Sequence, residues 1–144
     1  MKFTEIIGLF KETKTLTKSH MKNLLEMAMA DSHFDETEIQ LLHSLAKKYR
    51  VSEKELEEIK ADSANIKFEL PQNKDEKFEQ FYELVHMMTV DHDIDRAEMS
   101  LCKIFAKKFD YEKSDDMINV IVENIKNGLD WKESMSRVGM YNPL

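Results

Sequence analysis

Two short stretches of the chain carry carboxylates at the same spacing and could bind a metal ion. Residues 30–38 form the first acidic turn, and residues 90–98 form the second one, sixty positions later. Each turn has an Asp, a second Asp four positions on, and a Glu three positions after that. The carboxylates that we consider as ligands are Asp31, Asp35 and Glu38 in the first turn and Asp91, Asp93, Asp95 and Glu98 in the second. Carboxylate oxygens suit calcium, magnesium or manganese, and a cation would relieve the repulsion between the negative charges.

We expect the acidic turns to bind a cation weakly, with a Kd on the order of 10⁻⁴ to 10⁻³ M, because a loop this short does not wrap around an ion. Whether the two turns converge on one site stays open. The second turn should bind better, since Asp93 adds a fourth carboxylate. A complete EF-hand is excluded. Asp91, Asp93 and Asp95 match its first three ligands, but Arg96 stands where Gly is needed and Cys102 where a bidentate Glu is needed.

Helix capping gives the same carboxylates a simpler role. Asp35 with Glu38, and Asp95 with Glu98, have the spacing of a capping box, in which the first side chain accepts hydrogen bonds from the backbone of the first helical turn. Capping leaves the first Asp of each acidic turn unexplained, because an Asp at the end of the preceding helix opposes the helix dipole. These Asp side chains either bond loop amides or hold a cation, and both interpretations stay open.

The other reactive residues form no catalytic set. Glu83 and His86 have the Glu-x-x-His spacing of a di-iron bundle, but that chemistry needs two such motifs and the chain has one. We expect these side chains, with Glu76 and Glu79, to lie on a solvated helix face. Cys102 falls on an apolar stripe and is expected to be a buried small side chain. Without a Ser/His/Asp or Cys/His set or a Gly-rich phosphate loop, we predict that the protein is not an enzyme.

Apolar residues recur at helical spacing along almost the whole chain, and no window alternates as a strand does. Only three glycines and two prolines interrupt the pattern. Pro71 excludes a helix through the one extended-looking segment. The fold class is therefore all-α, with about eight helices. They are expected at about residues 3–10, 21–30, 35–50, 52–61, 73–90, 95–109, 114–127 and 130–138.

The similarity between the two halves extends beyond the acidic turns. Ala46 matches Ala106, Tyr49 matches Phe109, and a Lys pair stands between them in both halves. We expect one domain made of two pseudo-symmetric repeats, related by an approximate two-fold axis. Its parts are repeat one at about residues 18–62, a linker at 63–73, repeat two at about 74–128, and a short C-terminal helix with a tail at 129–144.

The duplicated pattern Asp-x-x-[Phe/Ile]-Asp-x-x-Glu resembles the signature turn of the TerB-like tellurite-resistance family, over roughly residues 18–128. The matching residues are Ala30, Asp31, Phe34, Asp35 and Glu38 in the first copy and Asp91, Ile94, Asp95 and Glu98 in the second. The chain departs from the family at a usual Gly, where it has Ser32 and His92. The resemblance implies an all-helical, internally duplicated bundle linked to metal-ion or tellurite stress and to membrane-associated assemblies, with no established reaction.

The composition limits the partners. The 144 residues carry a formal net charge of -7, with Lys and Arg scattered and not gathered in a basic stripe, so we expect no nucleic-acid binding. Cations or a protein partner with a basic surface are favoured. A single Cys, and the absence of any apolar run near the ~20 residues of a membrane span or of a signal peptide, predict a cytoplasmic protein without an integral membrane segment.

Two functions follow from the sequence. The first is a non-enzymatic TerB-like domain with an acidic surface that binds a divalent cation weakly. The alternative is a protein–protein interaction scaffold in which the acidic turns only cap helices.

Overall fold

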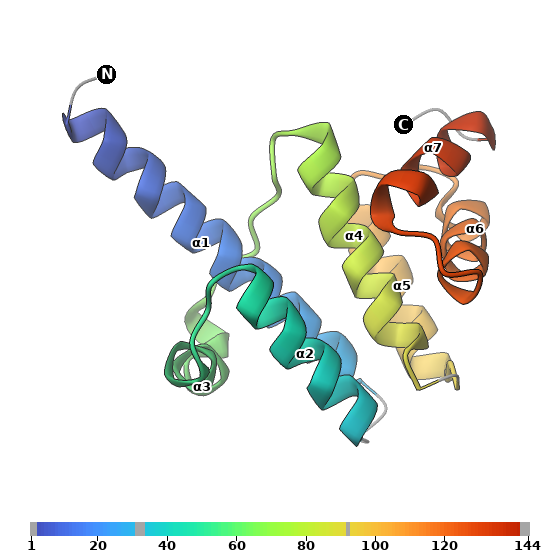
Figure 1. Cartoon of the computed structure of the whole chain (residues 1–144), viewed down its shortest axis with the longest axis horizontal. Helices are drawn as coiled ribbons and strands as arrows, with labels where there is room; N and C mark the ends of the chain where they lie inside the picture. The colour runs from blue at the N-terminus through green and yellow to red at the C-terminus, as the bar shows by residue number, and fades with distance from the viewer. Residues whose placement is uncertain (1–2, 31–33, 92, 142–144) are drawn as a thin grey trace.

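The described part of the chain is entirely helical. The computed structural model describes residues 3–30, 34–91 and 93–141, and the surroundings of the side chains from residue 14 to 139 within these ranges. They form seven α-helices and one short 3₁₀ turn, without a strand (Figure 1). The elements are α1 (Phe3–Ala28), α2 (Glu36–Lys48), α3 (Glu53–Ala61), η1 (Ser63–Asn65), α4 (Lys74–Thr89), α5 (Arg96–Lys108), α6 (Ser114–Lys126) and α7 (Trp131–Tyr141). The predicted all-α class is confirmed.

One element differs from the sequence prediction. The two helices expected at about residues 3–10 and 21–30 are a single helix, α1, of 26 residues. Residues 11–20 contain neither Gly nor Pro, so nothing in the intervening sequence ends the helix. The gap in the apolar stripe, which suggested a break, is partly filled by the buried polar residues Ser19 and His20.

Helix α4 lies at the centre of the bundle, between α1 and α2 on one side and α5, α6 and α7 on the other (Figure 1). Its apolar side chains, among them Phe78, Phe81 and Met88, are completely buried. They share one hydrophobic core with α1, α2, α3, α5, α6 and α7. Both acidic turns are therefore attached to helices that are anchored in the same core.

Five of the predicted helix starts are confirmed by side-chain hydrogen bonds, whereas α6 follows Lys113, whose side chain caps no amide. Asp35, Ser52 and Asp95 each accept from the backbone N–H three residues on, and the Glu at that position accepts from the cap residue in return. Asn73 accepts from two amides at the start of α4. Asp130 makes the same reciprocal pair before α7.

Two helix ends adopt a conformation that the sequence did not predict. Arg50 after α2 and Asp110 after α5 have φ of 59° and 61°, in the left-handed region. The next amides, of Val51 and Tyr111, donate to carbonyls five residues back, at 2.8 and 2.9 Å. This is the Schellman arrangement, usually completed by Gly, and a non-Gly residue there costs roughly 1 kcal/mol. Gly128 ends α6 in the same way.

The extended segment before α4 is bound along α1. The Ser19 hydroxyl accepts from the Glu69 amide at 2.8 Å, and Lys22 Nζ donates to the Ile66 carbonyl at 2.9 Å. Pro71 is buried and no helix passes through it, as expected. The segment is therefore held against α1 by polar contacts.

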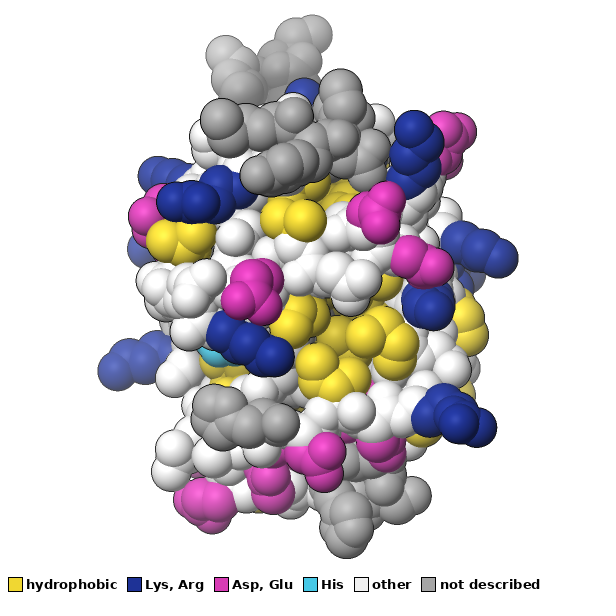
Figure 2. Space-filling model, turned by 90° about the vertical axis from the view of Figure 1, so that its right-hand side faces the viewer, with side chains coloured by type: hydrophobic (Ala, Val, Ile, Leu, Met, Phe, Trp, Pro, Cys, Tyr) yellow, Lys and Arg dark blue, Asp and Glu magenta, His cyan; other side chains and the backbone are white. Residues whose placement is uncertain are grey.

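On the face shown in Figure 2, hydrophobic side chains show in the middle, with acidic and basic side chains interspersed around them. No helix among the described residues is both long enough and apolar enough to span a membrane.

Candidate functional site

The two acidic turns meet in space. Asp35 and Glu38 from the first turn lie beside Asp91 from the second, and one carboxylate oxygen of each lies within 4.8 Å of the other two. We call these three residues the acidic triad. Asp35 and Glu38 stand at the start of α2, whereas Asp91 follows the end of α4.

Capping fixes the first two members of the acidic triad. Asp35 precedes α2 in an extended conformation, with φ -83° and ψ 174°. Its Oδ1 accepts from the Glu38 amide at 3.0 Å and from the Thr37 hydroxyl at 2.7 Å. Glu38 Oε1 accepts in return from the Asp35 amide at 3.4 Å. Asp35 is exposed, whereas Glu38 is completely buried.

Asp91 is held by its own turn. The side chain is half-buried, and its Oδ1 accepts from the Asp93 amide at 3.1 Å. This bond orients the Asp91 carboxylate in an Asx turn, as the sequence analysis allowed. It does not require a negative charge, because an Asn side chain would accept the same hydrogen bond.

The structure changes the predicted grouping of ligands. Among the described residues, the carboxylates that converge come from both turns, and the second turn does not form a separate group of three or more. Asp95 and Glu98 make a capping box that matches the one formed by Asp35 and Glu38, and Glu98 is almost fully buried. Asp93 is exposed. Asp31, Ser32, His33 and His92 lie outside the described residues.

The geometry of the acidic triad suits a hard cation. Calcium–oxygen distances are about 2.3–2.6 Å, so two oxygens on opposite sides of one calcium ion lie up to about 5.2 Å apart, whereas magnesium at about 2.0–2.1 Å spans up to about 4.2 Å. Three carboxylates leave further coordination positions for water. With one buried and two more accessible members, the site would be open on one side.

A buried polar network around Glu83 was not predicted from the sequence. Glu83, predicted on a solvated face, is only 3% exposed. One of its carboxylate oxygens lies 2.8 Å from His20 Nε2 and accepts from the Tyr49 hydroxyl at 2.6 Å, and the other accepts from Lys48 Nζ at 2.6 Å. Lys48 also binds Glu79 at 2.5 Å. The solvated-face prediction is therefore wrong for Glu83.

The network holds three helices together. Burial alone would raise the pKa of Glu83, but the hydrogen bonds from His20, Lys48 and Tyr49 outweigh it and lower the pKa. The pKa of Lys48 is raised, because its bonds to Glu79 and Glu83 outweigh the effect of burial. His20 is 1% exposed, which denies it to a substrate, so the network is structural. Its only signal in the sequence is that His20 continues the stripe of Leu24 by one helical turn.

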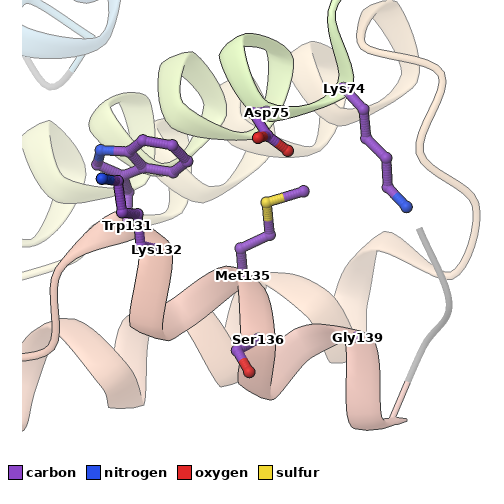
Figure 3. Close-up of a pocket in the computed structure, with 7 residues that line it drawn as sticks. All are labelled: Lys74, Asp75, Trp131, Lys132, Met135, Ser136 and Gly139. Carbon is purple, nitrogen blue, oxygen red and sulfur yellow. The ribbon is translucent and has the colours of Figure 1, made fainter.

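A shallow hollow lies between α4 and α7. Trp131 and Met135 point from α7 towards α4 in Figure 3, with Lys74 and Asp75 on the opposite side. The hollow lies on α4 and α7 and contains no member of the acidic triad. Cys102, as predicted, is completely buried, and burial raises the pKa of its thiol to about 12.

The chain matches no family model, no curated protein and no solved structure. The resemblance to the TerB-like family therefore stays a prediction that depends on the duplicated turn alone.

Proposed function

We propose that the protein is a non-enzymatic binding domain that holds one divalent cation between its two acidic turns. The observation that carries this proposal is the convergence of Asp35, Glu38 and Asp91 from segments far apart in the sequence. A role in metal-ion or tellurite stress is what the resemblance to the TerB-like family implies for such a site.

Capping explains part of this arrangement, but not all of it. It accounts for Asp35 and Glu38, whereas Asp91 caps no helix and its bond to the Asp93 amide needs no charge. Placing a third carboxylate against an already buried one costs electrostatic energy in the absence of a counter-ion. A bound cation would turn this repulsion into binding energy.

The alternative is that a basic side chain of a partner protein occupies the acidic triad in place of an ion. The exposed carboxylates of Asp35 in the triad, and of Glu36 and Asp93 next to its members in the sequence, favour it. In that case divalent cations would have no effect at millimolar concentration, while the triad would still be needed to bind the partner.

Thermal unfolding with and without cation tests the proposal. Asp91→Asn keeps the turn hydrogen bond and removes one charge. Without cation, this variant should be as stable as the wild type or slightly more stable, because repulsion is relieved. With a divalent cation at one hundred times Kd, the wild type should gain about 2.7 kcal/mol. That corresponds to a rise of roughly 5–10 °C in Tm, which the variant should lack.

Asp93→Asn is the matched control, because it removes an exposed charge from the same turn but lies outside the acidic triad. It should respond to calcium, magnesium and manganese as the wild type does. If neither the wild type nor Asp93→Asn responds to these cations, the cation proposal is wrong. It is also wrong if Asp91→Asn and Asp93→Asn lose the response equally.

A further inference from the structure

A second cavity, of about 500 Å³, lies between α1, α2 and α3, away from the acidic triad. We call it the α1–α3 cavity. Tyr49, Val51, Ile59 and Ile66 supply its apolar lining. The charged residues in its lining are Lys14, Lys18 and Arg50, and Glu55, Glu58 and Asp62.

The acidic groups of the cavity are mostly engaged within the protein. Glu55 accepts from the Ser52 amide at 3.2 Å as part of a capping box. Asp62 accepts from the Asn65 side-chain amide at 2.6 Å. Of the three, only the Glu58 side chain makes no hydrogen bond or ion pair with another described residue.

The basic groups are not engaged in this way. Lys14, Lys18 and Arg50 are exposed, and none of their side chains makes a hydrogen bond or ion pair with another residue in the described ranges. Lys14 and Lys18 influence Glu55 only at longer range: hydrogen bonds from Ser52 lower the pKa of Glu55 most, and the two lysines add to this effect. The lining thus carries three cationic side chains and three carboxylates. Two of the carboxylates are held in place by hydrogen bonds, whereas no described residue holds the three cationic side chains, which are free to turn towards a ligand.

The backbone and the floor of the cavity are held in place. Arg50 occupies the left-handed position of the α2 Schellman motif, so its Cα is fixed by hydrogen bonds on both sides. The Tyr49 ring is fixed by the bond from its hydroxyl to Glu83 and by an edge contact with His20 at 5.2 Å. Ile59 is almost fully buried beneath the opening.

We propose that the α1–α3 cavity binds a small organic oxyanion, with its phosphate or carboxylate at Lys14, Lys18 and Arg50 and its apolar body against Tyr49, Val51 and Ile59. Arg forms paired hydrogen bonds with either kind of anion, and the two lysines supply further charge. A cavity with an apolar floor and a few converging polar groups is typical of small-molecule sites. The proposal does not depend on the cation site.

Amide NMR titration of the full chain in a chelating buffer tests the proposal independently of any divalent cation. Phenyl phosphate and benzoate are the probes, which separates phosphate from carboxylate recognition, and benzyl alcohol is the neutral analogue. We expect at least one anion to shift the amides of Arg50, Val51 and Ile59 saturably. Benzyl alcohol should bind at least tenfold more weakly.

Substitutions that remove either a positive or a negative charge from the cavity give the decisive result. Lys18→Gln should weaken binding about tenfold, the effect of losing one charge-assisted hydrogen bond. Lys54→Gln, which removes an exposed charge on α3 outside the lining, should leave binding unchanged. Glu58→Gln should strengthen binding, since it removes one of the three negative charges in the lining.

Three results would overturn the proposal. They are the absence of saturable shifts with both anions, equal binding of benzyl alcohol, and weaker binding by Glu58→Gln. The last result would show that the cavity needs its negative charge. The spectrum of each variant without ligand also shows whether it is folded, so a loss of binding by an unfolded variant is recognised.

Discussion

At the scale of single residues, the cap positions were predictable because capping depends on local spacing. Asp35 and Asp95 accept from the amides three residues on, at 3.0 and 2.8 Å, as the capping-box pattern predicts. Contact between Asp91 and the first turn was not predictable. It depends on how α2 packs near the end of α4, which no local pattern records.

Replacing either cap residue by Ala should destabilise the protein. Asp35→Ala and Asp95→Ala each leave amides of the first helical turn without a partner, so we expect a loss of about 0.5–2 kcal/mol in the free energy of unfolding. Urea denaturation measures it. Asp→Asn at the same positions is the control, because Asn caps equally well. Equal losses in the Asn and Ala variants would show that charge, not capping, is what matters.

The buried network should make stability depend on acid. Since the pKa of Glu83 is lowered below its ordinary value of 4.5, its contribution is present above that pH. The contribution is lost as the pH falls below 4.5 through the pKa of the folded state. Glu83→Gln leaves Lys48 and His20 without their carboxylate and should cost about 2–4 kcal/mol at pH 7.

The difference between wild type and Glu83→Gln should then shrink as the pH falls below 4.5, which urea denaturation at several pH values measures. Glu79→Gln is a milder control, because this carboxylate is less buried and bonds only Lys48. A difference that stays constant down to pH 3 would contradict the network as described.

At the scale of helices, the sequence predicted most starts but not all ends. Starts depend on Asp, Ser and Asn at recognisable spacing, whereas the ends of α2 and α5 use Arg50 and Asp110 where Gly is the usual signal. The continuous α1 was missed for a related reason. The buried face of α1 includes the polar residues Ser19, His20 and Asn23. His20 is paired with Glu83 of α4, and Ser19 is bonded to the extended segment, so their burial depends on tertiary contacts that a local pattern does not show.

Asp110→Gly tests the strain assigned to the end of α5. Gly adopts a φ of 61° without steric cost, so the variant should be more stable than the wild type by up to about 1 kcal/mol. Asp110→Ala keeps the strain and serves as the control in thermal or urea unfolding. If the Gly variant is less stable than the Ala variant, the left-handed end does not limit stability.

At the scale of the whole molecule, the all-α class was predictable because helical periodicity persists through the chain. The two acidic turns share their capping geometry, with Asp35 at φ -83° and ψ 174° and Asp95 at φ -89° and ψ 173°. The two-fold relation between the repeats stays a prediction. Superposing α4, α5 and α6 on the second half of α1, α2 and α3 in an experimental structure would test it, and unrelated helix directions would contradict it.

The central claim is that one cation lies between the two acidic turns, and paramagnetic broadening by manganese tests it most directly. The amide NMR signals of Glu36, Thr37 and Glu38 should fade together with those of Asp91 and Asp93 at the same low concentration of manganese. Asp91→Asn should remove the broadening from both turns at once. Broadening that is confined to one turn, or that survives this substitution in the other, would contradict a shared site.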